Sequence, residues 1–195
     1  GVKHKMNYLL FILPLIYAIT NRVRGSLGFG GVVGGIVTGL VIAFFTQNYI
    51  LAALTVGLYI AGESWGWGKW IISVPHWGDP NWTPSQILLV RTDGKNNGIH
   101  WLANKLCSQT KNFSRYAQIA LALRGLWWWA PIYIAIAAFG HATIIGTVVA
   151  CLLSLTFPLC YYITYNVDSV NFWGYGEILY GFIQGLALIC VLFVI

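Results

Sequence analysis

Seven ionisable residues stand beside or within long apolar stretches of this sequence, and they are the residues best suited to chemistry. They are Arg22, Arg24, Glu63, Lys69, Arg124, Asp168 and Glu177. A charge among apolar groups is costly, so it normally faces a protein interior and meets a partner there. A guanidinium and a carboxylate satisfy each other's hydrogen bonds where water is scarce. The predicted partners are Arg24 and Arg124 on one side, and Glu63 and Glu177 on the other.

Two roles are open for these pairs. They could only fix the positions of helices, or they could line a pocket that binds an anion or relays a proton. In a pocket, Glu63 and Glu177 would be the catalytic residues, because a desolvated carboxyl group is suited to acid–base chemistry. The residues that would bind the substrate are Arg24, Lys69, Arg124 and Trp67.

The segment Gly62–Trp70 combines three glycines, three tryptophans and the charged residues Glu63 and Lys69. The glycines allow the backbone to bend tightly beneath the indole rings, which would seat a ligand. The alternative is a glycine-rich exit from a helix, anchored by interfacial tryptophans.

The strongest candidates for metal ligands are His76, Asp79, Asp93 and His100. No HExxH, paired CxxC or Walker-type motif accompanies them, and Pro75, Pro80 and Pro84 place the first pair on an irregular loop. We therefore expect no metal and no cofactor.

The composition indicates a membrane protein. Apolar residues make up 58% of the 195 residues and charged residues only 8%, against about a quarter in soluble domains. Such a chain cannot cover a soluble domain with polar groups, so we expect lipid as its partner. The net charge of +6 could suit nucleic acid, but the basic residues lie at the edges of apolar runs. We expect no nucleic-acid partner.

Six apolar stretches occur, at 7–20, 27–46, 49–63, 117–140, 142–165 and 174–195. A membrane-spanning helix needs about 20 apolar residues. The sequence therefore predicts an all-α fold, a polytopic transmembrane bundle of about six helices that forms one domain over 1–195. Pro131 is expected to kink or break the fourth helix.

Small residues repeat along two of these stretches. Gly31, Gly35 and Gly39 recur at four-residue spacing, and Gly181 and Gly185 repeat the pattern in the last stretch. Such faces allow close helix contact, so we expect packing within the chain, with a homo-oligomer as the alternative. An Arg-Gly pair followed by a Gly-Glu pair occurs in each half of the chain, as two related three-helix halves in inverted orientation would produce. The two spacings differ, at 39 and 53 residues, and glycine is abundant, so chance is the alternative.

The long connection 64–115 holds six of the ten tryptophans. Because indole prefers the headgroup boundary, we expect this segment to be an interfacial loop along the membrane surface. If all six stretches span, eight basic residues lie on the side of this loop: Arg22, Arg24, Lys69, Arg91, Lys95, Lys105, Lys111 and Arg115. The positive-inside rule then places the loop in the cytoplasm.

The chain resembles uncharacterised small polytopic membrane proteins encoded by phages and prophages. Those proteins pair an early Arg-x-Arg-Gly with a glycine- and aromatic-rich turn, then Leu-Arg-Gly and a late glutamate. Here the motifs are Arg22–Gly25, Gly62–Trp70, Leu123–Gly125 and Glu177. The resemblance implies a compact bundle in a bacterial inner membrane, and it implies no activity.

Three classes of function follow from these observations. The first is a membrane-embedded enzyme or binder that acts on a lipid-like or anionic small molecule through the charged residues. The second is a small transporter or channel that uses the same charges as a pathway. The third is a non-catalytic phage-type modulator of the host membrane, such as a holin or a superinfection-exclusion factor.

Overall fold

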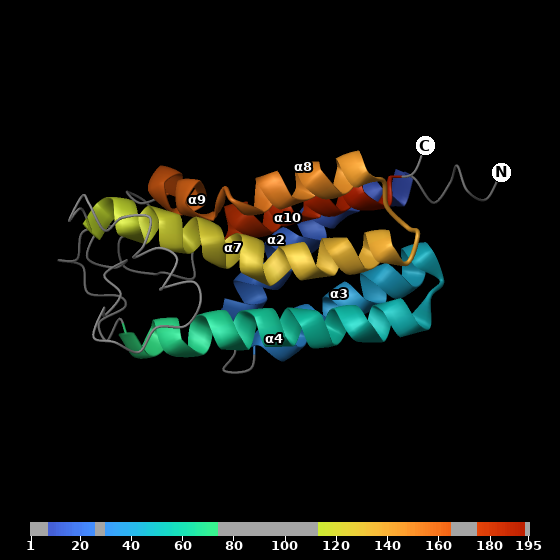
Figure 1. Ribbon diagram of the computed structural model, residues 1–195, viewed down its shortest axis with the longest axis horizontal. Helices are drawn as coiled ribbons and strands as arrows, with labels where there is room; N and C mark the ends of the chain where they lie inside the picture. The colour runs from blue at the N-terminus through green and yellow to red at the C-terminus, as the bar shows by residue number, and fades with distance from the viewer. Residues whose placement is uncertain (1–7, 26–29, 74–112, 165–174, 194–195) are drawn as a thin grey trace.

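A computed structural model of the chain describes residues 8–25, 30–73, 113–164 and 175–193, and every regular element within them is helical (Figure 1). The elements are the 3-10 turn η1 (Leu10–Ile12) and the α-helices α2 (Leu13–Gly25), α3 (Gly30–Thr46), α4 (Tyr49–Ser73), α7 (Phe113–Ala138), α8 (Ile144–Ser154), α9 (Phe157–Thr164) and α10 (Tyr175–Leu192). The all-α fold class predicted from the sequence is confirmed for this part of the chain.

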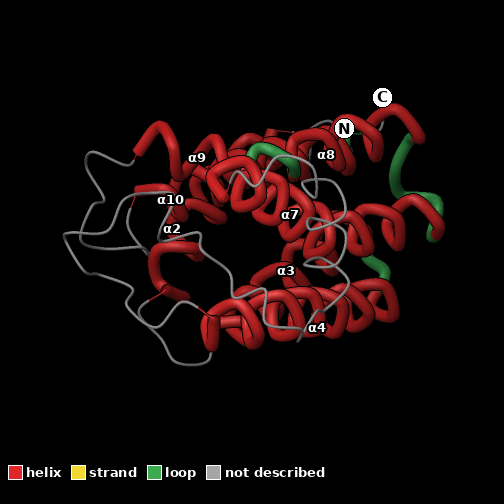
Figure 2. The backbone as a smooth tube through the Cα atoms, turned by 60° about the vertical axis from the view of Figure 1, so that its left-hand side comes forward, coloured by secondary structure: helices red, strands yellow, loops and turns green. Residues whose placement is uncertain are grey.

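The helices form a closed ring. Helix α2 packs against α3, α3 against α4, α4 against α7, and α7 against α8 and α9, which pack in turn against α10, and α10 returns to α2. Figure 2 shows α2, α3, α4, α7 and α10 around a common centre. Helices α8 and α9 run in the same direction, and the other successive helices alternate in direction, so α2, α4 and α9 end where α3, α7 and α10 begin (Figure 1). We call this end of the ring the α9 end.

Two short turns close the opposite end. Gln47 adopts a positive φ of 54° after α3, and the Asn48 side chain accepts a hydrogen bond of 3.0 Å from the amide of Leu51 to cap α4. Gly140 has a φ of 78° and ends α7, a conformation that glycine adopts without steric cost. The Thr143 hydroxyl then caps α8 by accepting from Gly146 N.

Pro131 and Pro158 have different effects on the helices that contain them. A proline at 158 has no N–H to donate to the carbonyl of Ser154, four residues earlier, and the predicted helix 142–165 divides there into α8 and α9. The Tyr180 hydroxyl of α10 donates to that same carbonyl at 3.1 Å, which satisfies it. At Pro131, by contrast, α7 continues from Phe113 to Ala138, so the helix does not break at this proline, and the alternative, a kink, stays a prediction.

Helix α4 is longer than the apolar stretch that predicted it. The stretch ends at Glu63, but the helix continues to Ser73. The glycines of this segment weaken a helix without forbidding it, and the nearest proline is Pro75, beyond the end of α4. Residues 64–73 of the predicted interfacial loop are therefore helical. The last three residues of that predicted loop, 113–115, belong to α7. Residues 74–112 lie outside the described part, so the surface position of the loop stays a prediction.

The glycine faces contact helices of the same chain, as expected. A Cβ built on Gly39 would lie 2.4 Å from Val56 of α4, and a Cβ on Gly181 would lie 2.3 Å from the Tyr17 carbonyl oxygen of α2. The α3–α4 and α2–α10 backbones can approach this closely only because these positions lack side chains. Self-association through the same faces would require these contacts to open, and the homo-oligomer stays a prediction.

The close approach of α2 and α10 gives a direct stability test. A Cβ on Gly185 would lie 2.3 Å from the Pro14 Cα, so Gly185→Ala must push the two backbones apart and should cost about 1–3 kcal/mol. Gly57→Ala is the matched control, because nothing lies within 4 Å of its Cβ and alanine favours helix. Thermal unfolding in detergent should show a lower midpoint for the first variant and an equal or higher one for the second. Equal midpoints would contradict the packing.

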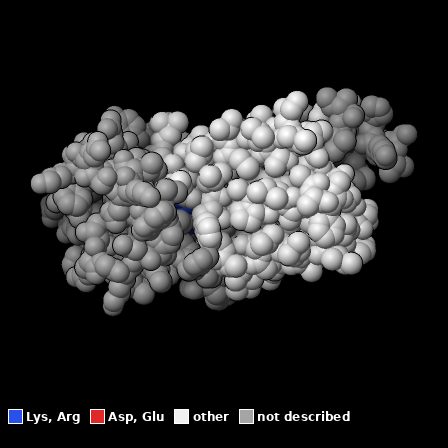
Figure 3. Space-filling view, viewed as in Figure 1, with Lys and Arg blue, Asp and Glu red and all other residues white. Residues whose placement is uncertain are grey.

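One described helix, α10 over Tyr175–Leu192, is long and apolar enough to cross a membrane by length and composition. Four further apolar helical segments are shorter, at 10–17 residues. Large apolar side chains nevertheless face outward on every α-helix of the ring. Examples, one from each α-helix, are Leu15, Ile36, Ile50, Ile134, Ile145, Leu159 and Phe182. On the face in Figure 3 the described surface is white apart from a small blue area beside the residues drawn in grey.

Candidate functional site

Most of the charged side chains whose placement is described are buried. The side chains of four charged residues are described, and of these only Arg22 is exposed. Glu63 has 8% of its surface exposed, Arg124 1% and Glu177 none. This is the reverse of a soluble domain, in which charged residues are almost never fully buried unless they are paired. These three residues, together with Asn21, form what we call the charged layer.

Arg124 lies between aromatic rings. It occupies α7 one turn before Trp128, and its guanidinium carbon is 5.2 Å from the centre of the Trp128 ring. Phe157, the first residue of α9, approaches it from the adjoining helix at 5.1 Å. Both distances suit cation–π attraction, which stabilises a guanidinium away from water. The two rings hold the planar group in place, so its N–H donors have a fixed direction.

Glu177 is held by the helix opposite. It lies in the first turn of α10, where the helix dipole favours a negative charge. The side-chain amide of Asn21, in α2, donates to the Glu177 backbone carbonyl at 3.1 Å and approaches Oε2 of its carboxylate at 3.5 Å. Asn21 is itself fully buried. One amide therefore joins α2 to the start of α10 and orients the carboxylate.

Glu63 rests on a glycine of α3. A Cβ on Gly31 would lie 2.0 Å from Oε2 of Glu63, so the carboxylate occupies the space that any other residue at 31 would fill. The neighbouring Gly62 packs against the Trp128 backbone, where a Cβ would lie 3.1 Å from its Cα. These two glycines let α4 approach α3 and α7 together.

The same set of contacts brings the charged side chains to one level of the ring. Gly125, next to Arg124, packs so closely on α10 that a Cβ there would lie 2.6 Å from the Tyr180 hydroxyl. On α10, Tyr180 is about one helical turn from Glu177. On α4, Gly62 precedes Glu63 and lies against Trp128, which is about one turn from Arg124 on α7. The charged layer therefore lies across the ring near its α9 end.

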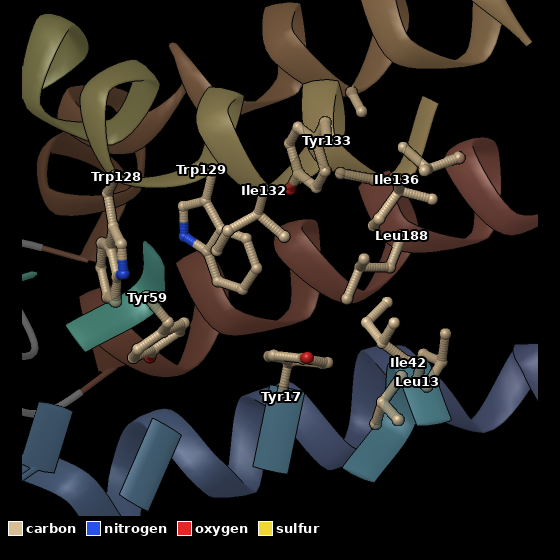
Figure 4. Packing of buried hydrophobic residues seen from close by; sticks show 14 of the residues in the cluster. Leu13, Tyr17, Ile42, Tyr59, Trp128, Trp129, Ile132, Tyr133, Ile136 and Leu188 are labelled. Carbon is tan, nitrogen blue, oxygen red and sulfur yellow. The ribbon is translucent and has the colours of Figure 1, made fainter. Parts of the chain in front are cut away.

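Next to the charged layer the interior holds aromatic, hydroxyl and amide groups. The Tyr17 hydroxyl donates to Thr38 Oγ1 at 3.0 Å, and the Trp129 ring packs edge-on to Tyr17 and stacks on Tyr133. Figure 4 shows these rings pointing to the centre of the ring of helices, with Trp128 and Tyr59 on one side. On the other side the interior is aliphatic, with Leu13, Ile42, Ile136 and Leu188 fully buried.

No protein-family model, curated protein or solved structure matches this chain. The chemistry of these buried side chains is therefore the basis for any functional conclusion.

The predicted site residues fall into two groups. Glu63, Arg124 and Glu177 are buried together at one level of the ring. Arg24 belongs to the last turn of α2, and Trp67 and Lys69 to the extension of α4, but their side chains lie outside the described part. The proposed Arg–Glu pairings stay predictions. Arg24 lies in the last turn of α2 whereas Arg124 lies well inside α7, so the two Arg-Gly motifs occupy different positions in their helices.

The candidate metal ligands His76, Asp79, Asp93 and His100 also lie outside the described residues. Within the described ranges, no three His, Cys, Asp or Glu side chains gather closely enough to hold a metal ion.

Several polar residues that are buried in the structure were not predicted as site residues, because the sequence prediction relied on charged side chains. They are Asn21, Thr38, Ser154, Tyr180 and Gln184. A signal did exist, since a polar residue within an apolar stretch must find a hydrogen bond in the interior. Gln184 is the clearest case, standing in the middle of the last stretch.

The link between Asn21 and Glu177 can be tested by substitution. Asn21→Ala leaves a buried carbonyl and carboxylate without this donor and should destabilise the fold by about 1–3 kcal/mol. The matched control is Thr20→Val, because the Thr20 hydroxyl bonds only Ile16 O of its own helix, at 2.7 Å. The control should change stability by about 0.5 kcal/mol or less. Thermal unfolding in detergent measures both, and equal losses would contradict the cross-helix role.

Proposed function

We propose that this chain is a multi-pass integral membrane protein that binds the polar head of a lipid-like molecule in the charged layer. The observation that carries the proposal is the reversal of polarity, with apolar side chains outside the ring and Glu63, Arg124 and Glu177 inside it.

Helix lengths support several crossings. Helix α3 has 17 residues, α4 has 25 and α7 has 26. At 1.5 Å per residue even α3 extends about 26 Å, close to the ~30 Å hydrocarbon core. Helices α8 and α9 are each short because of the interruption before Pro158, yet together they cover the length of one crossing. The resemblance to phage and prophage membrane proteins favours a bacterial inner membrane.

The composition of the charged layer indicates the chemistry of the ligand. Arg124 offers donors to an anionic oxygen, and the adjoining rings keep the guanidinium desolvated, which strengthens that interaction. Glu63 and Glu177 offer acceptors, so a purely anionic ligand would be repelled by them. A head group that carries both an anionic oxygen and a hydroxyl or ammonium donor matches this set. An acid–base catalytic role for the two glutamates is the corresponding enzyme hypothesis.

The interior packing favours a binder over an open channel. Leu13, Ile42, Ile136 and Leu188 fill the described ring on the side away from the charged layer (Figure 4). A polar solute that reached the charged layer would meet these apolar side chains and could not continue without a rearrangement.

The binding proposal is tested by lipid-induced thermal stabilisation of the delipidated protein in detergent. Phosphatidylglycerol and phosphatidylethanolamine have a phosphate and a donor, whereas phosphatidylcholine with the same acyl chains has no donor. The first two should raise the unfolding temperature more than the third. The effect should be lost in Arg124→Gln and kept in Arg22→Gln, which removes an exposed arginine. Equal stabilisation by all three lipids, or persistence in Arg124→Gln, would refute specific binding in this layer.

A further inference from the structure

Gln184 has a hydrogen-bonding group that no atom of the described residues satisfies. Its side chain is fully buried in α10. Oε1 accepts a hydrogen bond from the Tyr133 hydroxyl of α7 and lies 3.4 Å from Ser154 Oγ of α8. Nε2 is buried and has no hydrogen-bond partner. Both N–H bonds of this amide are thus left without an acceptor among the described residues, which is rare for a fully buried side chain.

Reversing the amide does not remove the deficit. The Ser154 hydroxyl has one hydrogen, and Ala150 O accepts it at 3.0 Å. With the amide oxygen and nitrogen exchanged, the nitrogen would donate to Ser154 and Tyr133, and the oxygen would occupy the position that has no partner. Each orientation therefore leaves one end of the amide facing a site that needs a hydrogen-bonding atom.

We propose that this site holds a bound water molecule, coordinated by the free end of the Gln184 amide. Water both donates and accepts, so it satisfies either orientation. Gln184 follows Glu177 by seven residues, two turns further along the same face of α10. Leu188, one more turn along that face, belongs to the aliphatic part of the interior. The water therefore lies between the level of Glu177 and the aliphatic part of the interior, and the inference does not depend on lipid binding in the charged layer.

Radiolytic hydroxyl-radical labelling tests the water directly, because radicals generated from a bound water oxidise the side chains beside it. Tyr133, which contacts Gln184, should be oxidised in the detergent-solubilised wild type. Tyr17 is the matched control, since it is equally buried and its hydroxyl bonds a protein group, Thr38. Gln184→Leu removes the amide and should reduce Tyr133 labelling several-fold while Tyr17 stays unchanged. Labelling of Tyr133 no greater than that of Tyr17, and unaffected by Gln184→Leu, would refute the site.

A second measurement reads the amide in the wild-type protein itself. In the ¹⁵N-labelled wild type, the Gln184 side-chain amide protons should show magnetisation transfer from water. Gln184→Met, which keeps the length of the side chain, is needed only to assign the signal. Absence of this transfer from the resolved amide signal would show that the site is dry and that the amide is left unsatisfied.

Discussion

Arg124→Gln should abolish lipid-induced stabilisation and also lower the unfolding temperature of the lipid-free protein more than any other single substitution of a charged residue. The guanidinium is 1% exposed and lies in a layer with two glutamates. Removing one member of a buried charged group leaves the others uncompensated, which costs about 3–5 kcal/mol. Thermal unfolding with and without phosphatidylglycerol measures both effects.

Arg124→Lys separates the charge from the shape of the side chain. Lysine keeps the positive charge but loses the planar group that packs against Trp128 and Phe157. It should therefore recover part of the stability and only a fraction of the lipid response. Full recovery of lipid binding by lysine would mean that a point charge suffices and that the fixed orientation of the guanidinium is unimportant.

Gly31→Ala should have the second largest effect, because its new Cβ would lie 2.0 Å from Oε2 of Glu63. The carboxylate must leave its position or α3 must move away from α4. Displacing a buried carboxylate disrupts its hydrogen bonding and should destabilise the fold by about 2–4 kcal/mol, combining overpacking with loss of a buried polar interaction.

A double-mutant cycle identifies the cause of that loss. Glu63→Ala removes the carboxylate that Gly31→Ala displaces, so the second change should cost far less when the first is present. We expect a coupling of about 1–3 kcal/mol from unfolding measurements on the four proteins of the cycle. Additive losses would show that the alanine at 31 disturbs something other than Glu63.

The places of the helices along the chain could be predicted from the sequence, because apolar length alone marks a helix that must be buried or face lipid. About six helices were predicted, whereas the described part holds seven α-helices. The exceptions have local causes. The fifth stretch divides because Pro158 leaves the Ser154 carbonyl free, and that interruption persists because Tyr180 donates to it. Tyr180 comes from another helix, so sequence spacing within the stretch could not reveal this contact. The end of α4 was misplaced because the apolar count stopped at Glu63, whereas the helix itself continues.

The charged residues of the candidate site could be predicted from the sequence, but the contacts that position them could not. Burial of Glu63, Arg124 and Glu177 follows from their positions in apolar stretches. The amide of Asn21 and the free space beside Gly31 depend on which helices are neighbours. Which helices are neighbours could not be deduced from the sequence, because the contact that closes the ring, between α2 and α10, joins opposite ends of the chain.

The most direct test of lipid-head binding is solid-state NMR distance measurement between lipid phosphorus and arginine side chains. The protein, labelled with ¹³C at arginine Cζ, would be reconstituted in phosphatidylglycerol, and ¹³C–³¹P dipolar dephasing recorded for the wild type and for Arg124→Gln. We predict a strongly dephased Cζ signal, at hydrogen-bonding distance from phosphate, that is present in the wild type and missing from the variant. If the signal lost in the variant shows no dephasing in the wild type, Arg124 does not bind the head group and the proposal is wrong.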